Sequence, residues 1–359
     1  MRTTLPRSPW LRVVFVLVCA VAVASAIWWR GPSWTAVSDA FTVVRWRWVI
    51  AAVGLNLLSV VARSIAWRIV IQQAVPPPRP RYGQVFAAFS VGLMANAVLP
   101  GRIGELARVA VLNRRMPGRS GMWATLVGTV FAHRLFDLVA VLALITFVLF
   151  TAPIPHWAVT SMAAVVAVGV VLLVFAVAGA KHHNNRSPLD GLGAVRRLLT
   201  MARHGLGVMH TPLAAAEATF FQALGWVFQL LAVWTAMRAF HIYEGIAAAG
   251  LVLVLMNVAT IFPLWPGNVG LLQAAVALPL VRYGVSYGRA FAFGIGLQAI
   301  EASVGVGFGL LFLAREGLSF AMLKRMPGAA QAEVPEEEVD ARDSSAGEPE
   351  RRLAGARRR

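Results

Sequence analysis

The sequence predicts an all-α integral membrane protein with about six transmembrane helices plus two re-entrant broken-helix hairpins in an inverted repeat. Three observations predict this fold class. Hydrophobic residues make up 58% of the 359 residues and charged residues only 14%, whereas charged residues are about 25% of a soluble protein. Several apolar runs approach the roughly 20 residues that a helix needs to cross a bilayer. Two shorter apolar runs are each interrupted by a proline-glycine pair.

The first interruption lies in residues 96–108, which read N-A-V-L-P-G-R-I-G-E-L-A-R. Proline lacks an amide donor and glycine admits unusual backbone angles, so we expect Pro100 and Gly101 to end one helix and Gly104 to allow another to start. Lipid offers no hydrogen-bond partner, so a broken helix at membrane depth needs protein or a water-filled cavity around it. The charged residues of this stretch therefore imply a charged cavity.

The second interruption repeats the first. Residues 266–270 read P-G-N-V-G and match the P-G-x-[IV]-G pattern of residues 100–104 at an offset of 166 residues (266 minus 100). Interrupted segments at matching positions of two halves indicate the binding site of a transporter that is built from repeats. We expect the repeat halves at about 48–150 and 213–314. Their hairpins would enter from opposite faces, so that both breaks meet near the bilayer midplane.

The membrane domain is predicted to cover residues 1–330. The expected full spans are 13–27, 48–66, 121–150, 157–180, 213–240 and 290–314, and the expected half-helices are 85–98, 103–112, 245–262 and 267–281. Apolar residues at helical spacing predict an amphipathic helix on the cytoplasmic surface at 187–210. The tail, 331–359, is rich in Glu, Pro, Gly, Ser and Arg, which indicates a disordered, charged segment.

The distribution of Arg and Lys predicts the orientation. Basic residues beside the spans place both termini in the cytoplasm, in a multi-pass protein of the cell (inner) membrane. The same topology accounts for the net charge of +17, so we expect no nucleic-acid partner. Arg63, near the inner end of its predicted span, is explained by a side chain that extends to the membrane surface. We expect no cofactor and no metal.

The charged and Gly/Pro positions agree in order and spacing with a known family. They resemble the transmembrane region of lysylphosphatidylglycerol synthases and of stand-alone flippase-like proteins over residues 40–320. The residues that carry the resemblance are Asn96, Pro100, Arg102, Gly104, Glu105, Arg108, Arg134, Asp137, Pro266, Gly267 and Gly270. The resemblance implies a lipid flippase region without the soluble aminoacyl-transferase domain. Two positions depart from the family, since His133 and Gln273 stand where glutamate is common.

We expect a lipid translocase that moves an anionic or phosphate-bearing head group through a cavity between the two broken helices. Half-helices would point free amides and the positive dipole end at the phosphate, and the guanidinium groups of Arg102 and Arg134 suit it in charge and geometry. The expected partner is a membrane phospholipid or a polyprenyl-phosphate-linked lipid, and a homo-oligomer or a partner lipid-modifying enzyme is compatible with the sequence. The candidate substrate-binding residues are Asn96, Pro100, Gly101, Arg102, Gly104, Glu105, Arg108, His133, Arg134, Asp137, Pro266, Gly267, Asn268, Gly270, Gln273 and Glu301.

Alternatives to this function and to this use of the charges stay open. Glu105 with Arg108, and Arg134 with Asp137, are three residues apart and can satisfy each other on a helix without any ligand. Arg108 can also serve as an anchor at the inner surface. A membrane-bound transferase acting on a lipid-linked substrate would need a general base or a metal held by carboxylates, and the loops contain no D-x-D. A non-transporting lipid-binding scaffold is the other alternative.

The chain contains no G-x-x-x-x-G-K-[ST] loop for nucleotide phosphates. If transport is driven, we therefore expect it to be coupled through protonation of His133, Asp137 and Glu301. The alternative is a passive scramblase in which these three groups are fixed counter-ions of the arginines.

Overall fold

The computed structural model describes residues 33–99, 103–116, 122–152, 167, 211–261 and 266–315, and all regular structure within them is helical. The helices are α2 (Trp34–Thr42), α3 (Trp46–Ala74), α4 (Tyr82–Val98), α5 (Gly104–Arg114), α6 (Met122–Thr151), α9 (Pro212–Ala239), α10 (Ile246–Ile261), the 3₁₀ turn η2 (Pro266–Asn268), α11 (Leu271–Val281) and α12 (Tyr287–Arg315). The predicted spans at 13–27 and 157–180, the surface helix at 187–210 and the tail at 331–359 lie outside the described residues. So do the site candidates Pro100, Gly101 and Arg102.

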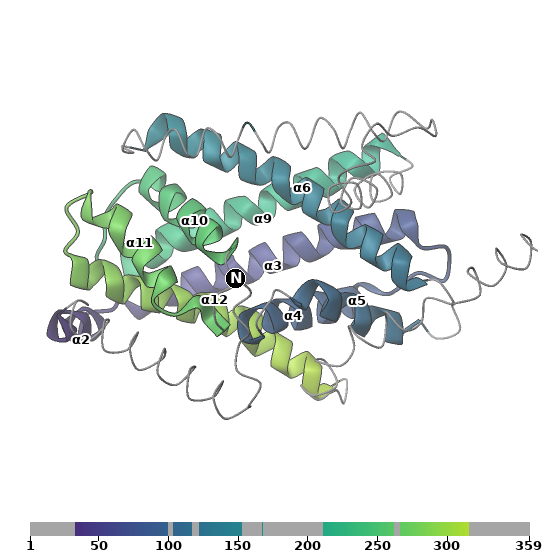
Figure 1. Ribbon diagram of the computed structural model, residues 1–359, viewed down its shortest axis with the longest axis horizontal. Helices are drawn as coiled ribbons and strands as arrows, with labels where there is room; N and C mark the ends of the chain where they lie inside the picture. The colour runs from purple at the N-terminus through teal and green to yellow at the C-terminus, as the bar shows by residue number, and fades with distance from the viewer. Residues whose placement is uncertain are drawn as a thin grey trace, which may run out of the picture.

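Four of these helices are long and apolar enough to cross a membrane. They are α3, residues Thr125–Thr151 of α6, α9 and α12, and Figure 1 shows them running along the length of the molecule. Local sequence signals define where these helices begin and end. For example, Thr211 caps α9 by accepting a hydrogen bond from the amide of Ala214, and Pro212 occupies the first turn. The prediction of an all-α membrane protein is confirmed.

Two helix pairs are too short to span. The pair α4 and α5 flanks the first proline-glycine break, and the pair α10 and α11 flanks the second. Figure 1 shows α4 and α5 toward one end of the long helices and α10 and α11 toward the other. Helix α4, which precedes the first break in the chain, is also in contact with η2, the turn at the second break.

The helices recur at the offset that the proline-glycine motif suggested. Adding 166 to the bounds of α3 gives 212–240, and α9 is Pro212–Ala239. The same addition brings α4, α5 and α6 to within three residues of the bounds of α10, α11 and α12. The two series therefore have the same order and nearly the same lengths.

Helix α3 is longer than the predicted span at 48–66, so the predicted end of this span is wrong. The helix continues to Ala74 because Trp67 and Ile71 are completely buried, and Trp67 Nε1 donates a hydrogen bond of 3.2 Å to Thr129 Oγ1 of α6. The chain turns only at residues 76–78, where three prolines lack the amides that a helix needs. Arg63 consequently lies in the interior of α3.

Candidate functional site

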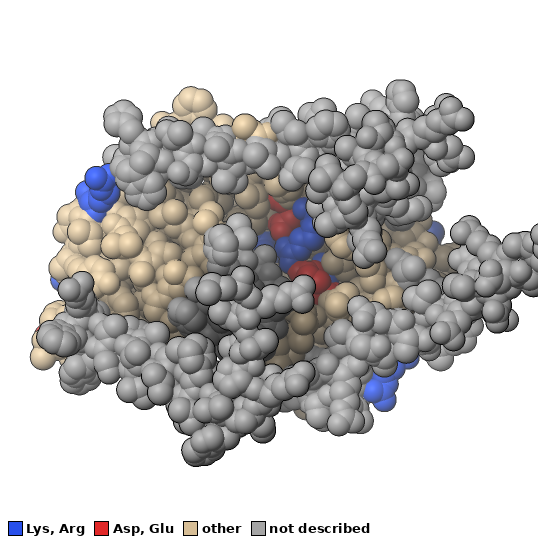
Figure 2. Space-filling view, viewed as in Figure 1, with Lys and Arg blue, Asp and Glu red and all other residues tan. Residues whose placement is uncertain are grey.

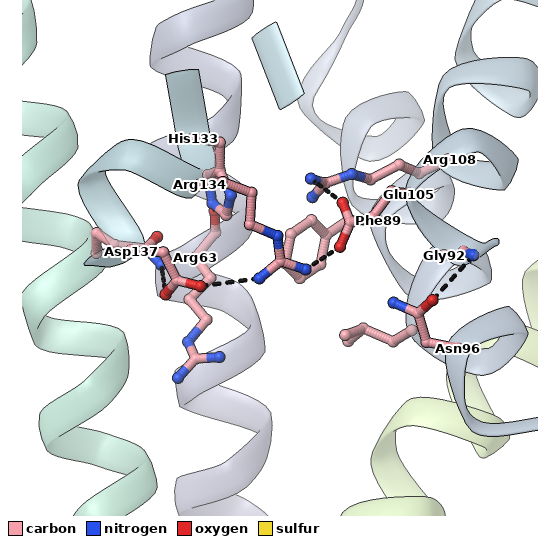
Figure 3. Close-up of a pocket in the computed structure, with 12 residues that line it drawn as sticks. Arg63, Phe89, Gly92, Asn96, Glu105, Arg108, His133, Arg134 and Asp137 are labelled. Atoms are coloured by element: carbon pink, nitrogen blue, oxygen red, sulfur yellow. Dashed lines mark hydrogen bonds and ion pairs between the residues drawn. The ribbon is translucent and has the colours of Figure 1, made fainter. Parts of the chain in front are cut away.

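A small cavity lies where α3, α4, α5, α6 and α9 meet. Its volume is about 40 Å³, enough for a few water molecules. Arg63, Phe89, Gly92, Leu93, Asn96, Gly104, Glu105, Arg108, His133, Arg134, Asp137 and Gln222 line it, and Figure 3 shows their side chains. Figure 2 shows acidic and basic side chains gathered near the middle of the drawn face, beside uncharged surface. Charge is therefore concentrated at a depth where the helices are otherwise apolar.

Arg134 of α6 joins two carboxylates in this cavity. Its Nη1 donates to Asp137 Oδ2 at 2.8 Å, and its Nη2 contacts Glu105 Oε1 of α5 (Figure 3). The Arg134 side chain is 49% exposed, against 24% for Glu105 and 5% for Arg108. Among these ion-paired groups, Arg134 is the one that a ligand reaches most easily.

Three side chains from two helices, α6 and α9, hold Asp137 in place. Besides Arg134 of its own helix, Gln222 Nε2 and Trp226 Nε1 of α9 each donate to Asp137 Oδ1 at 2.6 Å. Three donors, one of them cationic, stabilise the buried carboxylate. The residue itself is buried. Asp137 therefore already has three hydrogen-bond donors around it, and it holds Arg134 in place.

Arg108 of α5 is buried between aromatic rings. Its guanidinium carbon lies 4.7 Å from the ring centroid of Trp67 and 5.5 Å from that of Phe89, and it forms an ion pair with Glu105. Aromatic faces attract a cation, most strongly where water is excluded. Arg108 is thus part of the interior cluster, and the alternative of an anchor at the membrane surface is wrong.

Two glycines let α4 and α5 approach each other. A Cβ atom at Gly92 would lie 2.9 Å from the carbonyl oxygen of Gly104, closer than real Cβ contacts come. The amide of Gly104 donates to Asn96 Oδ1 at 2.9 Å. This amide starts the half-helix α5, and it already has a partner. The sequence predicts the free amides of this half-helix at its start at Arg102, which lies outside the described residues, so that prediction stays open.

The side-chain amides of Gln273 and Gln298 form hydrogen bonds at the second break. Gln273 Oε1 accepts from the amide of Gly270, Gln273 Nε2 donates to Gln298 Oε1, and Gln298 Nε2 donates to the carbonyl of Gly267, each at 2.5 Å. Gly267 and Gly270 have φ of 70° and 91°, which favour glycine. The amide of Gly270 and the carbonyl of Gly267 are thus bonded to side chains of α11 and α12.

The structure therefore separates the predicted site residues into two groups. Asn96, Gly104, Glu105, Arg108, His133, Arg134 and Asp137 line the cavity. Gly267, Gly270 and Gln273 belong to the amide cluster, Pro266 lies in η2, and the buried Asn268 donates to the carbonyl of Ala259 at 3.4 Å. Glu301 of α12 is in neither group.

Arg63 is a cavity residue that the sequence prediction missed. Its Nη2 donates to Gln229 Oε1 of α9 at 2.5 Å, and its guanidinium carbon lies 4.6 Å from the ring centroid of Trp226. A signal was present in the sequence, because Gln222, Trp226 and Gln229 follow one another by four and three residues and so share a helix face. Polar groups on one face of an apolar span indicate an interior site.

The comparison with protein families agrees with this architecture. Residues 10–309 match the family described as the lysylphosphatidylglycerol synthase TM region. The chain belongs to this family. The match includes every residue that lines the cavity and both broken helix pairs. Comparisons with curated proteins and with solved structures found no match.

Membership of the lysylphosphatidylglycerol synthase TM-region family confirms the resemblance drawn from the sequence. Together with the four apolar helices, it makes the chain a multi-pass membrane protein with a function related to membrane lipids. In this family member, the cluster around Arg134 places charged side chains in a cavity between these helices.

Proposed function

We propose that the protein translocates an anionic or phosphate-bearing lipid head group across the cell membrane through the cavity that its first broken helix pair, α4 and α5, lines together with α3, α6 and α9. The observation that carries this proposal is the position of Arg134. It is half exposed, it lies inside a cluster of buried charges, and the cluster is surrounded by apolar membrane helices. Ionisable groups at such depth are costly and usually serve a function.

The charges of the residues that line the cavity favour the binding of an anion. Three arginines line the cavity, at positions 63, 108 and 134, against the two carboxylates of Glu105 and Asp137. A phosphate group would meet the surplus positive charge, and a guanidinium offers it two parallel donors. A cationic group alone would add to the surplus. We therefore favour a lipid whose head group carries a phosphate.

The small cavity corresponds to a closed state of the proposed pathway. Its volume of about 40 Å³ holds a few water molecules and not a lipid head group. The contact between Arg134 of α6 and Glu105 of α5 closes it. A phosphate that binds Arg134 would replace Glu105, and the helix pair α4 and α5 would then be free to move away from α6.

The repeated helix order supports alternating access. The series α3 to α6 and α9 to α12 correspond at an offset of 166, and the two broken pairs lie toward opposite ends of the long helices (Figure 1). In an inverted repeat, one half can open a central site to one face while the other half closes the opposite face. We propose this arrangement, with both termini in the cytoplasm.

The test uses purified protein in unilamellar vesicles with a trace of fluorescent phosphatidylglycerol. A membrane-impermeant quencher bleaches the outer leaflet at once, and the inner leaflet only if lipid crosses. We expect the protein vesicles to lose the inner-leaflet fraction, and protein-free vesicles to retain it. Fluorescent phosphatidylcholine in parallel vesicles tests the preference for a net anionic head group. Saturable binding with no crossing would favour the scaffold, and a chemically altered lipid would favour the transferase.

A further inference from the structure

The three carboxylates in the interior of the described chain differ in their partners. Glu105 contacts both Arg108 and Arg134. Asp137 contacts Arg134 and accepts from Gln222 and Trp226. Glu301 has no ion pair within the described residues, and the hydrogen bond to its side chain there is one of 3.3 Å from Gln229 Nε2. Glu301 is therefore the least compensated of the three.

The place of Glu301 in the chain makes its lack of an ion pair important. Glu301 lies near the middle of α12, a 29-residue helix long and apolar enough to span the membrane. An ionised carboxylate is costly in that environment unless a cation or several donors compensate it. If Glu301 accepts a proton, its side chain becomes neutral, which removes the cost of the buried charge without any movement of the backbone. Asp137 and Glu105 have arginine partners that stabilise their ionised forms, so they do not need to accept a proton.

A chain of side chains connects Glu301 to the cavity. Gln229 donates through Nε2 to Glu301 Oε1, and its Oε1 accepts from Arg63 Nη2 at 2.5 Å. Arg63 lines the cavity and stacks on Trp226, which donates to Asp137. One amide thus stands between Glu301 and a guanidinium that faces the candidate lipid site.

We propose that Glu301 is a proton-exchange site, and that Gln229 transmits its protonation state to Arg63. While Glu301 is ionised, Gln229 donates to it and accepts from Arg63. When Glu301 takes up a proton, its hydroxyl becomes a donor, and the Gln229 carbonyl oxygen can accept from it after the amide rotates. Arg63 then loses that acceptor and becomes available to an anion in the cavity. This coupling rests on the proposed function, whereas the proton exchange itself does not.

Among the described residues, Arg63 is the charged group near Glu301. Helix α12 packs against α2, α3, α4, α9 and α11, and in the described parts of these helices the charged group that faces Glu301 is Arg63, across Gln229. On α12 itself, Arg289 and Arg315 lie more than three turns away. The candidates His133 and Asp137 lie on α6. His133 Nε2 lies 3.2 Å from the carbonyl oxygen of Arg63, to which it can donate a hydrogen bond.

The direct test is an infrared titration of the protein in lipid nanodiscs. A protonated carboxyl group in an apolar site gives a C=O stretching band distinct from that of carboxylates. We expect a band that rises as pH falls, disappears in Glu301→Gln, and persists with a changed position in Glu301→Asp, which keeps the titrating group. The band should remain in Asp137→Asn. An unchanged band in Glu301→Gln, or loss of the band in Asp137→Asn only, would overturn the assignment.

A second measurement tests the coupling. The ratio of lipid crossing rates with and without an imposed pH gradient should be several-fold for the parent and close to one for Glu301→Gln. Glu217→Gln is the matched control, because Glu217 is an exposed carboxylate on α9, and it should keep the parental ratio. A ratio of one for the parent would remove the coupling. Absence of crossing in any vesicle would refute the proposed function and leave the infrared result to decide on Glu301.

Discussion

Arg63 and Gln229 meet where α3 crosses α9, with Arg63 Nη2 2.5 Å from Gln229 Oε1. The 166 residues that separate them also separate Pro100 from Pro266. In the proposed inverted repeat these are equivalent residues, so the axis that relates the halves passes between them. One half contributes a cation at the axis and the other a neutral amide. The pseudo-symmetry of the fold is therefore broken at its centre.

The asymmetry extends outward from this pair. The positions 166 residues after Glu105 and Arg108 are Leu271 and Ala274. The first half therefore carries the charged cavity, and the second half carries the amide cluster of Gln273 and Gln298. We infer that the first broken pair binds the head group.

The close approach of α4 and α5 predicts an effect on stability. A Cβ atom at Gly104 would overlap the carbonyl oxygen of Gly92 and lie 2.5 Å from Asn96 Oδ1. Gly104→Ala should reduce the free energy of unfolding by about 1–3 kcal/mol, as overpacking does. Thermal unfolding of the detergent-solubilised protein measures it. The control is Gly128→Ala in α6, where nothing lies within 4 Å and a helical alanine is favoured by up to about 1 kcal/mol. Equal melting temperatures for the two variants would refute the packing argument.

The contact between Glu105 and Arg134 predicts competition with the ligand. Glu105→Gln removes the carboxylate that the phosphate would have to replace, so anionic lipid should bind more tightly, by roughly 10-fold, the scale of one hydrogen bond to a charged group. The melting temperature should fall at the same time, because Arg108 also loses its ion-pair partner. Binding of short-chain phosphatidylglycerol is measured by calorimetry. Weaker binding by Glu105→Gln would instead make Glu105 part of the binding site.

The proposed topology predicts the two faces of the membrane. Arg114 ends α5 and Arg282 follows α11. In a Cys19→Ser background, a single cysteine at 114 should react with an impermeant thiol reagent only after the cytoplasmic face is exposed. A cysteine at 282 should react from outside in intact cells. Labelling of both positions from the same side would contradict the inverted arrangement of the hairpins.

Much of the helical architecture was predictable from the sequence. The four described spans and both broken pairs follow from apolar run length and from the Pro-Gly motifs, and their observed bounds lie within a few residues of the predicted ones at most ends. The exception is the end of α3. The burial of Trp67 and Ile71 against other helices extends this helix, and such tertiary packing is not visible in a local pattern.

The site was predictable only in part, for a related reason. The cluster of Glu105, Arg108, His133, Arg134 and Asp137 follows from charges in an apolar context. Its links to α9 follow only in part, because Gln222, Trp226 and Gln229 share one helix face but the sequence does not show which helices that face contacts. The contacts of Gln222 and Gln229 depend on the crossing of α3 and α9. That crossing is close because Gly225 faces the Arg63 side chain, where a Cβ atom would lie 2.6 Å from Cγ.

The central claim is that Arg134 binds the head group of a lipid that crosses the membrane. Arg134→Gln keeps a polar side chain but removes the charge, and Arg114→Gln makes the same change at an exposed arginine at the end of α5. Both variants are purified, checked for a single folded species and reconstituted at equal density. Crossing of fluorescent phosphatidylglycerol is then measured. The account predicts at least a roughly 10-fold slower rate for Arg134→Gln, the effect of one lost charge-assisted contact, and the parental rate for Arg114→Gln. Parental rates for both variants would contradict it.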